Sequence, residues 1–323
     1  APVPPGLAAL AAPRVLNGGK RLRQVLSRHW AWALLACPLA VSAVEAAATL
    51  TLLEGAATLV RGVTRYALAE GVRLQAGDIL EVGDKALAEI EFTDGAAVTL
   101  GPKTRALARS LARSKAAQGD FYVPQGVMKV ARVAPAARLR FVSPLFAIQP
   151  EQGSAVLLVG GAEESVFVEG GSLRLGATRA RGAAAAPLQL GTGQFFTGAN
   201  LQRGSVGSRL SPAFVAALPK LFLDPLPSRL ARFKDRAAQP RALDTVSYAE
   251  VETWLKAPPE FRGPMLARLR SRIDDEQFRA ALVANLRFHP EWDPVLFPEK
   301  YEPKAPDAPP QPLQPPQPPE KRP

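Results

Sequence analysis

Three aspartates are the residues whose type and spacing could do acid–base chemistry. The steps that contain them are Gly77-Asp78, Gly83-Asp84 and Asp94-Gly95. Two carboxylates a few ångströms apart can act as acid and nucleophile in glycoside hydrolysis. Each aspartate, however, has a glycine beside it. That pairing is typical of tight turns, because glycine adopts positive φ and aspartate hydrogen-bonds its own backbone. We therefore interpret all three steps as structural turns.

The sequence has few of the histidines and cysteines that other catalytic sites and metal sites use. The sequence contains two histidines, His29 and His289, and one cysteine, Cys37. Two histidines so far apart do not suggest a metal site. A Ser-His-Asp triad would have to use His289, and no Gly-x-Ser-x-Gly elbow or Gly-Lys-Ser/Thr phosphate loop accompanies it. We expect His289 to cap a helix or pack beside Trp292, and we predict no enzyme and no cofactor.

The turns must be positioned by short strands. Residues 71–102 read GVRLQAGDILEVGDKALAEIEFTDGAAVTLGP, in which small and apolar residues alternate with a second set between the turns. The inner set is Ala86, Ala88, Ile90 and Phe92, and the outer set is Leu87, Glu89 and Glu91. Alternation at period two is typical of strands with one buried face. The expected core residues are Leu74, Ile79, Ile90, Phe92, Val98 and Leu100.

The first residues resemble an export signal. Lys20, Arg21, Arg23 and Arg28 precede the apolar run WAWALLACPLAVSAV, and the small-residue sites Val41-Ser42-Ala43 and Val44-Glu45-Ala46 follow. A basic segment, an apolar run of this length and a small-residue site are typical of a signal peptide. We predict a leader and signal peptide over 1–46 and a periplasmic location. An uncleaved inner-membrane anchor at 30–44 is the alternative. Cys37 is a candidate lipidation site because Leu34-Leu35-Ala36-Cys37 resembles a lipobox.

Composition divides the rest of the chain into three parts. Glycine-punctuated, strand-like sequence fills 47–205 and predicts a β domain. Helical signals begin at Ser211-Pro212, an N-cap followed by proline, and continue with the capping box Ser247 to Glu250, so 211–300 is expected to be a helical domain or appendage. Residues 303–323 hold ten prolines. This tail is expected to be disordered or polyproline II.

The formal net charge is +11. A candidate anion-binding patch is formed by Lys103, Arg105, Arg109, Arg113 and Lys115, and a solvated edge is its alternative. The basic residues are dispersed without interleaved aromatics, and an exported chain does not meet nucleic acid, so nucleic-acid binding is not expected. The expected partner is an envelope protein or an anionic glycan, which a positive surface would attract.

The 71–102 block resembles the FecR domain. The resemblance is carried by the step from Gly71 through Leu74 to Gly77-Asp78, the alternating strand that ends in Phe92-Thr93-Asp94-Gly95, and the apolar strand before Gly101-Pro102. Further along, three shorter features are similar to later parts of that family: Phe141-Val142-Ser143-Pro144, Val166 to Gly170, and Gly191-Thr192-Gly193-Gln194.

The resemblance implies an all-β periplasmic domain, a roll or stacked sandwich, used in envelope sensing. The best-known members pass a signal from an outer-membrane transporter to a cytoplasmic sigma factor. Only residues 1–29 precede the apolar run here. The leading hypothesis is therefore an exported, non-enzymatic envelope binding protein. A membrane-anchored signalling regulator and an envelope polysaccharide hydrolase are the alternatives.

Overall fold

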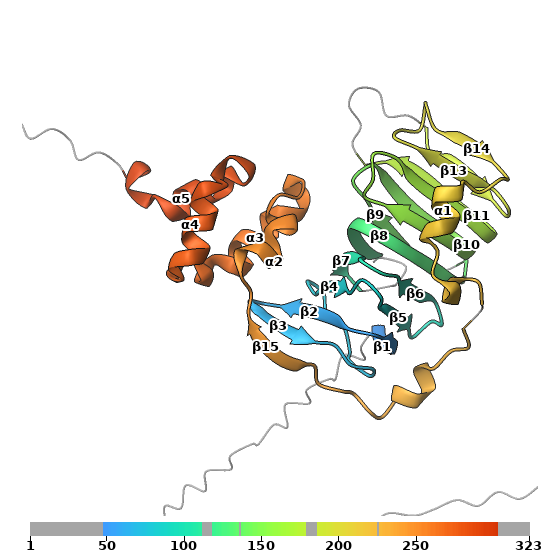
Figure 1. Ribbon diagram of the computed structural model, residues 1–323, viewed down its shortest axis with the longest axis horizontal. Helices are drawn as coiled ribbons and strands as arrows, with labels where there is room; N and C mark the ends of the chain where they lie inside the picture. The colour runs from blue at the N-terminus through green and yellow to red at the C-terminus, as the bar shows by residue number, and fades with distance from the viewer. Residues whose placement is uncertain (1–47, 112–117, 136, 179–185, 225, 303–323) are drawn as a thin grey trace, which may run out of the picture. The chain divides into compact units, whose positions relative to one another are not determined.

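The computed structural model describes residues 48–111, 118–135, 137–178, 186–224 and 226–302 (Figure 1). The predicted leader with Cys37, the basic residues Arg113 and Lys115, and the proline-rich tail lie outside the described residues. No helix in the described part of the chain has the length and apolar character that a membrane crossing requires.

The described residues form a mainly β fold with a small helical region, as predicted. The strands are β1 (Ala48–Glu54), β2 (Ala57–Arg61), β3 (Thr64–Ala67), β4 (Ile79–Val82), β5 (Leu87–Phe92), β6 (Ala97–Leu100), β7 (Arg105–Ser110), β8 (Gly119–Val133), β9 (Leu139–Val142), β10 (Phe146–Val159), β11 (Glu164–Ala177), β12 (Leu188–Gly191), β13 (Phe195–Gly198), β14 (Ser205–Gly207) and β15 (Arg241–Thr245). They join in one hydrogen-bonded sheet, antiparallel throughout except between β8 and β9.

Long strands carry the sheet from one layer into the next. The first part of β8 pairs with β7 and β9, and its last part pairs with β6 and β10. Gly126 lies between the two parts with φ of 127°. A Cβ atom there would come within 2.3 Å of Thr104 Oγ1. Only glycine tolerates both the backbone angle and the close approach, so Gly126 permits this corner.

The core between the layers contains the residues that alternation predicted. Leu74, Ile90, Phe92, Val98 and Leu100 all lie in the inner core. The sixth expected residue, Ile79, is equally buried but faces the other way, towards the helices. Phe92 packs edge-on against Phe121, with ring centroids 6.2 Å apart. The alternation is therefore a correct guide to the buried face of β5.

The second face of β5 differs from the sequence expectation. All six residues of this strand are buried, including Glu89 and Glu91. A one-sided strand would expose both carboxylates, and the alternation by itself pointed to that arrangement. The difference arises because a later part of the chain crosses this face.

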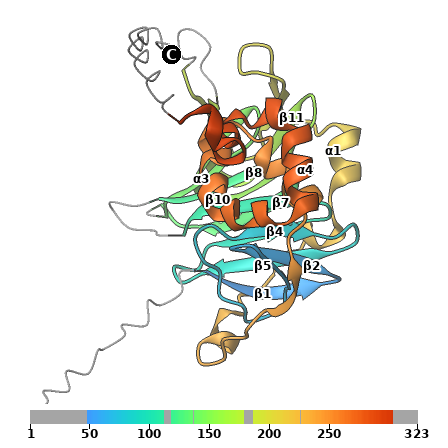
Figure 2. The ribbon, with the colours of Figure 1, turned by 90° about the vertical axis from the view of Figure 1, so that its left-hand side faces the viewer.

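The last helices cover one outer face of the sheet (Figure 2). Tyr122 on β8 points to the helices while its neighbours Phe121 and Val123 enter the inner core. The ring of Tyr122 stacks on Phe261 with centroids 3.8 Å apart. The helices are α1 (Pro212–Ala217), α2 (Tyr248–Leu255), α3 (Pro259–Leu269), α4 (Glu276–Ala284) and α5 (Asp293–Leu296), with 3₁₀ turns η1 (Lys220–Phe222), η2 (Leu230–Phe233), η3 (Arg270–Asp274), η4 (Leu286–Phe288), η5 (Pro290–Trp292) and η6 (Pro298–Lys300).

One arginine fastens the helices to the sheet through backbone atoms. Arg268 of α3 donates to the carbonyl oxygens of Val60 at 2.6 Å, Gly62 at 2.8 Å and Gly77 at 2.5 Å. The predicted caps are confirmed, because Ser211 caps α1 and Ser247 forms a capping box with Glu250. His289 packs inside the helical core, with Nε2 3.2 Å from the Tyr248 hydroxyl.

The stretch before α2 is less helical than predicted. In the described residues between β14 and β15, the helical elements are α1 and two 3₁₀ turns, and residues 241–245 join the sheet beside β3 as β15. Pro219, Pro227 and Pro240 lack the backbone donor that a helix interior needs. We call residues 211–224 and 226–238 the covering segment, because it crosses the outer face formed by β1, β5, β6 and β8. Phe214 and Phe222 anchor its beginning in an apolar cluster with Leu52, Leu87 and Val127.

A buried acid in β11 is built to hold a proton. Burial raises the pKa of Glu164 from its ordinary 4.5 to about 7. Its carboxyl meets Ser143 Oγ, which also accepts from Phe146 N at 2.9 Å and donates to Phe146 O at 3.0 Å. The serine has one proton to donate, and it can go to Phe146 O. A protonated Glu164 that donates to Ser143 then satisfies every atom of the network.

We predict that Glu164→Gln removes a pH dependence of stability. The folded protein binds this proton more tightly than the unfolded chain, so stability falls as the pH rises from 4.5 to about 7. Glutamine imitates the neutral acid. Near pH 4.5, urea unfolding should give the same free energy of unfolding for the variant and the wild type. Above pH 7, the variant should be more stable than the wild type by up to about 3 kcal/mol. The control is the exposed neighbour, Glu163→Gln. Parallel pH profiles for both variants and the wild type would refute the assignment.

Candidate functional site

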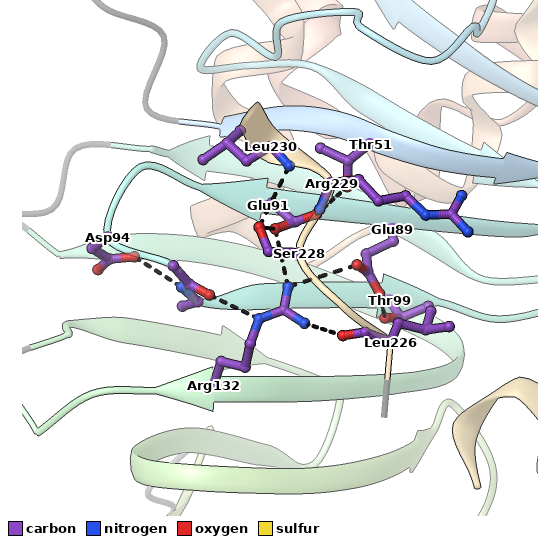
Figure 3. Close-up of polar contacts among 12 residues, drawn as sticks. Thr51, Glu89, Glu91, Asp94, Thr99, Arg132, Leu226, Ser228, Arg229 and Leu230 are labelled. Carbon is purple, nitrogen blue, oxygen red and sulfur yellow. Dashed lines mark hydrogen bonds and ion pairs between the residues drawn. The ribbon is translucent and has the colours of Figure 1, made fainter. Parts of the chain in front are cut away.

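Two adjacent carboxylates on β5 lie beneath the covering segment (Figure 3). Glu91 is 0% exposed and Glu89 is 2% exposed. Glu91 accepts from Thr51 Oγ1 at 2.8 Å, from the Ser228 hydroxyl and from the backbone N of Arg229 at 2.7 Å. Two of these three donors come from the covering segment. The Glu91 carboxylate therefore holds that segment against the sheet, and we call it the latch.

Glu89 has a different environment. Thr99 Oγ1 donates to its Oε2 at 3.0 Å, and its Oε1 faces Arg132 Nη2 at 3.7 Å. Burial raises the pKa of Glu89, the bonds from Thr99 and the charge of Arg132 oppose the rise, and the charge of Glu91 adds to it. Arg132 Nη2 also lies 3.2 Å from Glu91 Oε2. One guanidinium thus serves both carboxylates, which limits their repulsion.

A bulge in β8 brings Arg132 to this face. Lys129 lies on the covered face, and Val130 and Val133 both enter the inner core. Strict alternation would put Val133 on the same face as Lys129. The register against β10 shifts between Gly153 and Ala155, and Arg132 has φ of 56°. A left-handed arginine costs about 1 kcal/mol or more, and here it places the guanidinium between the two carboxylates.

Charged side chains of the sheet hold the covering segment by its backbone. Lys129 Nζ donates to Phe222 O at 2.5 Å, and Arg132 Nη1 donates to Leu226 O at 2.8 Å. Glu91 accepts from Arg229 N. These contacts use only the backbone atoms of Phe222, Leu226 and Arg229. They fix the path of the chain into η2.

A pocket opens where the latched segment meets β1. We call it the η2 pocket, and its volume is about 370 Å³. Its walls combine two cations, three hydroxyls and an aromatic ring, from Thr49, Arg73, Thr93, Ser228, Leu230, Ala231, Phe233 and Lys234. Ser228 links pocket and latch, because it lines the pocket and its hydroxyl donates to Glu91. Among the described residues, no carboxylate lines this pocket.

A second hollow is also lined by Phe233. This outer pocket has a volume of about 440 Å³ and is lined by Glu70, Arg232, Phe233, Arg236, Ala237 and Ala238. Its carboxylate, Glu70, accepts from Leu53 N at 3.1 Å. Phe233 lines both pockets and packs beside Gly71, whose Cβ, if present, would come within 3.0 Å of the ring. Phe233 therefore borders both hollows.

The cations of both pockets lack acidic partners. Within the described residues, neither Arg73 nor Lys234 forms an ion pair, and Arg232 and Arg236 form none either. In the described part of the chain, the guanidinium of Arg73 makes one hydrogen bond, to Lys234 O at 3.1 Å. Unpaired cations around a hollow make a favourable place for an anion.

The basic patch predicted from sequence looks different. Its described members are each near carboxylates: Lys103 lies 3.9 Å from Asp84, Arg105 lies 3.2 Å from Glu81, and Arg109 lies 2.8 Å from Asp120. Arg109 also packs over the ring of Phe261. An added anion would compete with these acids. The unpaired cations around η2 were not singled out by sequence reasoning.

The three predicted turns are present, but their aspartates differ. Asp94 accepts from Ala96 N at 3.2 Å, and the side chain of Asp84 is 78% exposed. Asp78 is buried; besides accepting from Gln75 N at 2.8 Å, it forms a bidentate pair with Arg61. The turn glycines Gly77 and Gly95 have positive φ, as expected. Gly83 does not, but a Cβ there would meet Ala56 O at 2.8 Å.

Sequence reasoning missed the carboxylate latch, although one signal was available. On the face of Glu89 and Glu91 the paired strands carry Thr51 and Thr99. Hydroxyls beside two acids, with Leu87 among them, indicate a covered polar face. Within the described residues, no group of three or more His, Cys, Asp or Glu side chains is placed to hold a metal ion.

Comparison with known proteins gives no match to a protein-family model and none to a curated protein. Two crystal structures of a proposed anti-sigma factor from Parabacteroides distasonis are distantly similar, with sequence identities of 11% and 12% and a TM-score of 0.32 each. Each match covers 40% of this chain, and this chain spans 57% of either structure. At this level the likeness transfers neither fold nor function.

We predict that Glu91→Gln loosens the covering segment. The change removes the charge that faces Arg132 and weakens the acceptor for Ser228 and Arg229, at a cost of about 3 kcal/mol. Amide hydrogen exchange should rise in residues 226–234 and stay unchanged in β10 and β11. Asp84→Asn, which alters an exposed carboxylate, should change neither. Unaltered exchange in 226–234 would show that the latch does not hold this segment.

Proposed function

We propose that this protein is an exported, non-enzymatic envelope protein that binds an anionic partner through the η2 pocket. The observation that carries the proposal is the pair Arg73 and Lys234, which line a hollow without a carboxylate and have no ion-pair partner among the described residues. The periplasmic location is supported by the signal-peptide pattern of 1–46 and by the sequence resemblance to FecR domains. The alternative of a membrane-anchored signalling regulator requires that residues 30–44 remain part of the protein as an anchor.

The polysaccharide hydrolase has less support. The carboxylate pair on β5 is the closest match to its chemistry, but Glu91 accepts three hydrogen bonds and both acids lie under the covering segment. A substrate would have to displace that segment to reach them. The η2 pocket itself has no acid among its lining residues. Binding without turnover is the function that these positions favour.

Charge reversal in the η2 pocket tests the proposal. We predict that the double variant Arg73→Glu, Lys234→Glu loses about tenfold or more of its affinity for washed envelope fragments. Cosedimentation at increasing salt is the measurement, and the wild type should release as salt rises. The matched control combines Lys85→Glu with Lys103→Glu, two exposed lysines outside both pockets whose replacement changes the net charge by the same amount. If the double variant sedimented with the fragments as the wild type does, the η2 pocket would not be the binding site.

A further inference from the structure

The two pockets beside η2 share one wall and carry the same sign of charge. Arg73 and Lys234 line the η2 pocket, and Arg232 and Arg236 line the outer pocket. Phe233 lines both. A single small anion would use one pair of cations and leave the other pair unused. The repetition across the ring indicates a ligand that carries anionic groups at intervals.

The chemistry of the walls narrows the class of that ligand. Besides its cations, the η2 pocket is lined by Thr49 and Thr93 and by the apolar residues Leu230 and Phe233, while the hydroxyl of Ser228 already donates to Glu91. Hydroxyls match the hydroxyls of a sugar, cations match its carboxylates, and an aromatic ring matches the apolar face of a pyranose. Volumes of about 370 and 440 Å³ suit one or two sugar units each, within the usual ~300–1,000 Å³ of small-ligand sites.

An acidic peptide fits the same walls less well. Peptides commonly bind by adding a strand to a free sheet edge or by laying a helix in an apolar groove. The walls here are a 3₁₀ turn and the residues Thr49 and Arg73, which already form a β-bridge with each other. Neither mode of peptide binding finds its usual template in these walls.

We infer that the anionic partner is an acidic polysaccharide that occupies both pockets, with Phe233 between neighbouring sugar units. This inference rests on the proposed function and specifies its ligand. Glu70 sets a limit at the outer end, because its carboxylate lines the outer pocket and would repel an anionic group placed beside it. The anionic groups of the chain therefore lie towards Arg232 and Arg236.

The test measures by calorimetry the affinity of the full chain and its variants for oligogalacturonates of increasing length. We predict that the hexamer binds at least about tenfold more tightly than the monomer. Arg232→Glu combined with Arg236→Glu should remove the gain in affinity from monomer to hexamer. Phe233→Leu keeps an apolar wall and should weaken the hexamer by about tenfold.

Poly-glutamate of matched charge separates sugar recognition from simple charge attraction. It should bind much more weakly than the hexamer and be insensitive to Phe233→Leu. Equal or tighter binding of poly-glutamate, or an affinity independent of oligogalacturonate length, would overturn the inference. The proposed function would survive that result if envelope cosedimentation still required Arg73 and Lys234, and it would fall if cosedimentation did not.

Discussion

The burial of Glu91 is the constraint on which this structure depends. A carboxylate without access to water is costly unless donors and a counter-charge surround it. β5 and its neighbours supply Thr51 and Arg132, and the other donors, Ser228 and Arg229 N, lie 137 and 138 residues further along the chain. The outer face of β5 is therefore completed only when the covering segment arrives. The native packing of this part of the sheet therefore depends on the covering segment.

The same device appears on the opposite face of the sheet. There Arg268 reaches from α3 to three carbonyl oxygens of the sheet and its turns. On both faces a charged side chain binds backbone atoms of a distant segment. The contacts set the path of each segment and leave its exposed side chains free to vary. On the latched face, the covering segment carries Lys234 and Phe233 of the η2 pocket, and the second cation, Arg73, comes from the chain between β3 and β4.

The sequence could predict what local patterns determine. Alternation identified Ile90 and Phe92 as core, and the serines at 211 and 247 marked helix starts, because each signal lies within a few residues. Thr51 and Thr99 beside the two acids indicate that this face of β5 is covered, but they do not indicate which segment covers it, because Lys129 and Arg132 bind that segment through backbone atoms that every residue has. The bulge at Arg132 was equally hidden, since it depends on the register between β8 and β10. The β15 strand was missed because its partner, β3, is far away in the chain.

The central claim is that the Glu91 latch positions the cations of the η2 pocket, and anion affinity of Glu91→Gln tests it most directly. Removing a negative charge beside the pocket would by itself strengthen the binding of an anion. Loosening the segment that carries Ser228 and Lys234 would weaken it. Calorimetry with oligogalacturonate hexamer should show an affinity below that of the wild type, with Asp84→Asn unchanged. An affinity equal to or above the wild type would contradict the account.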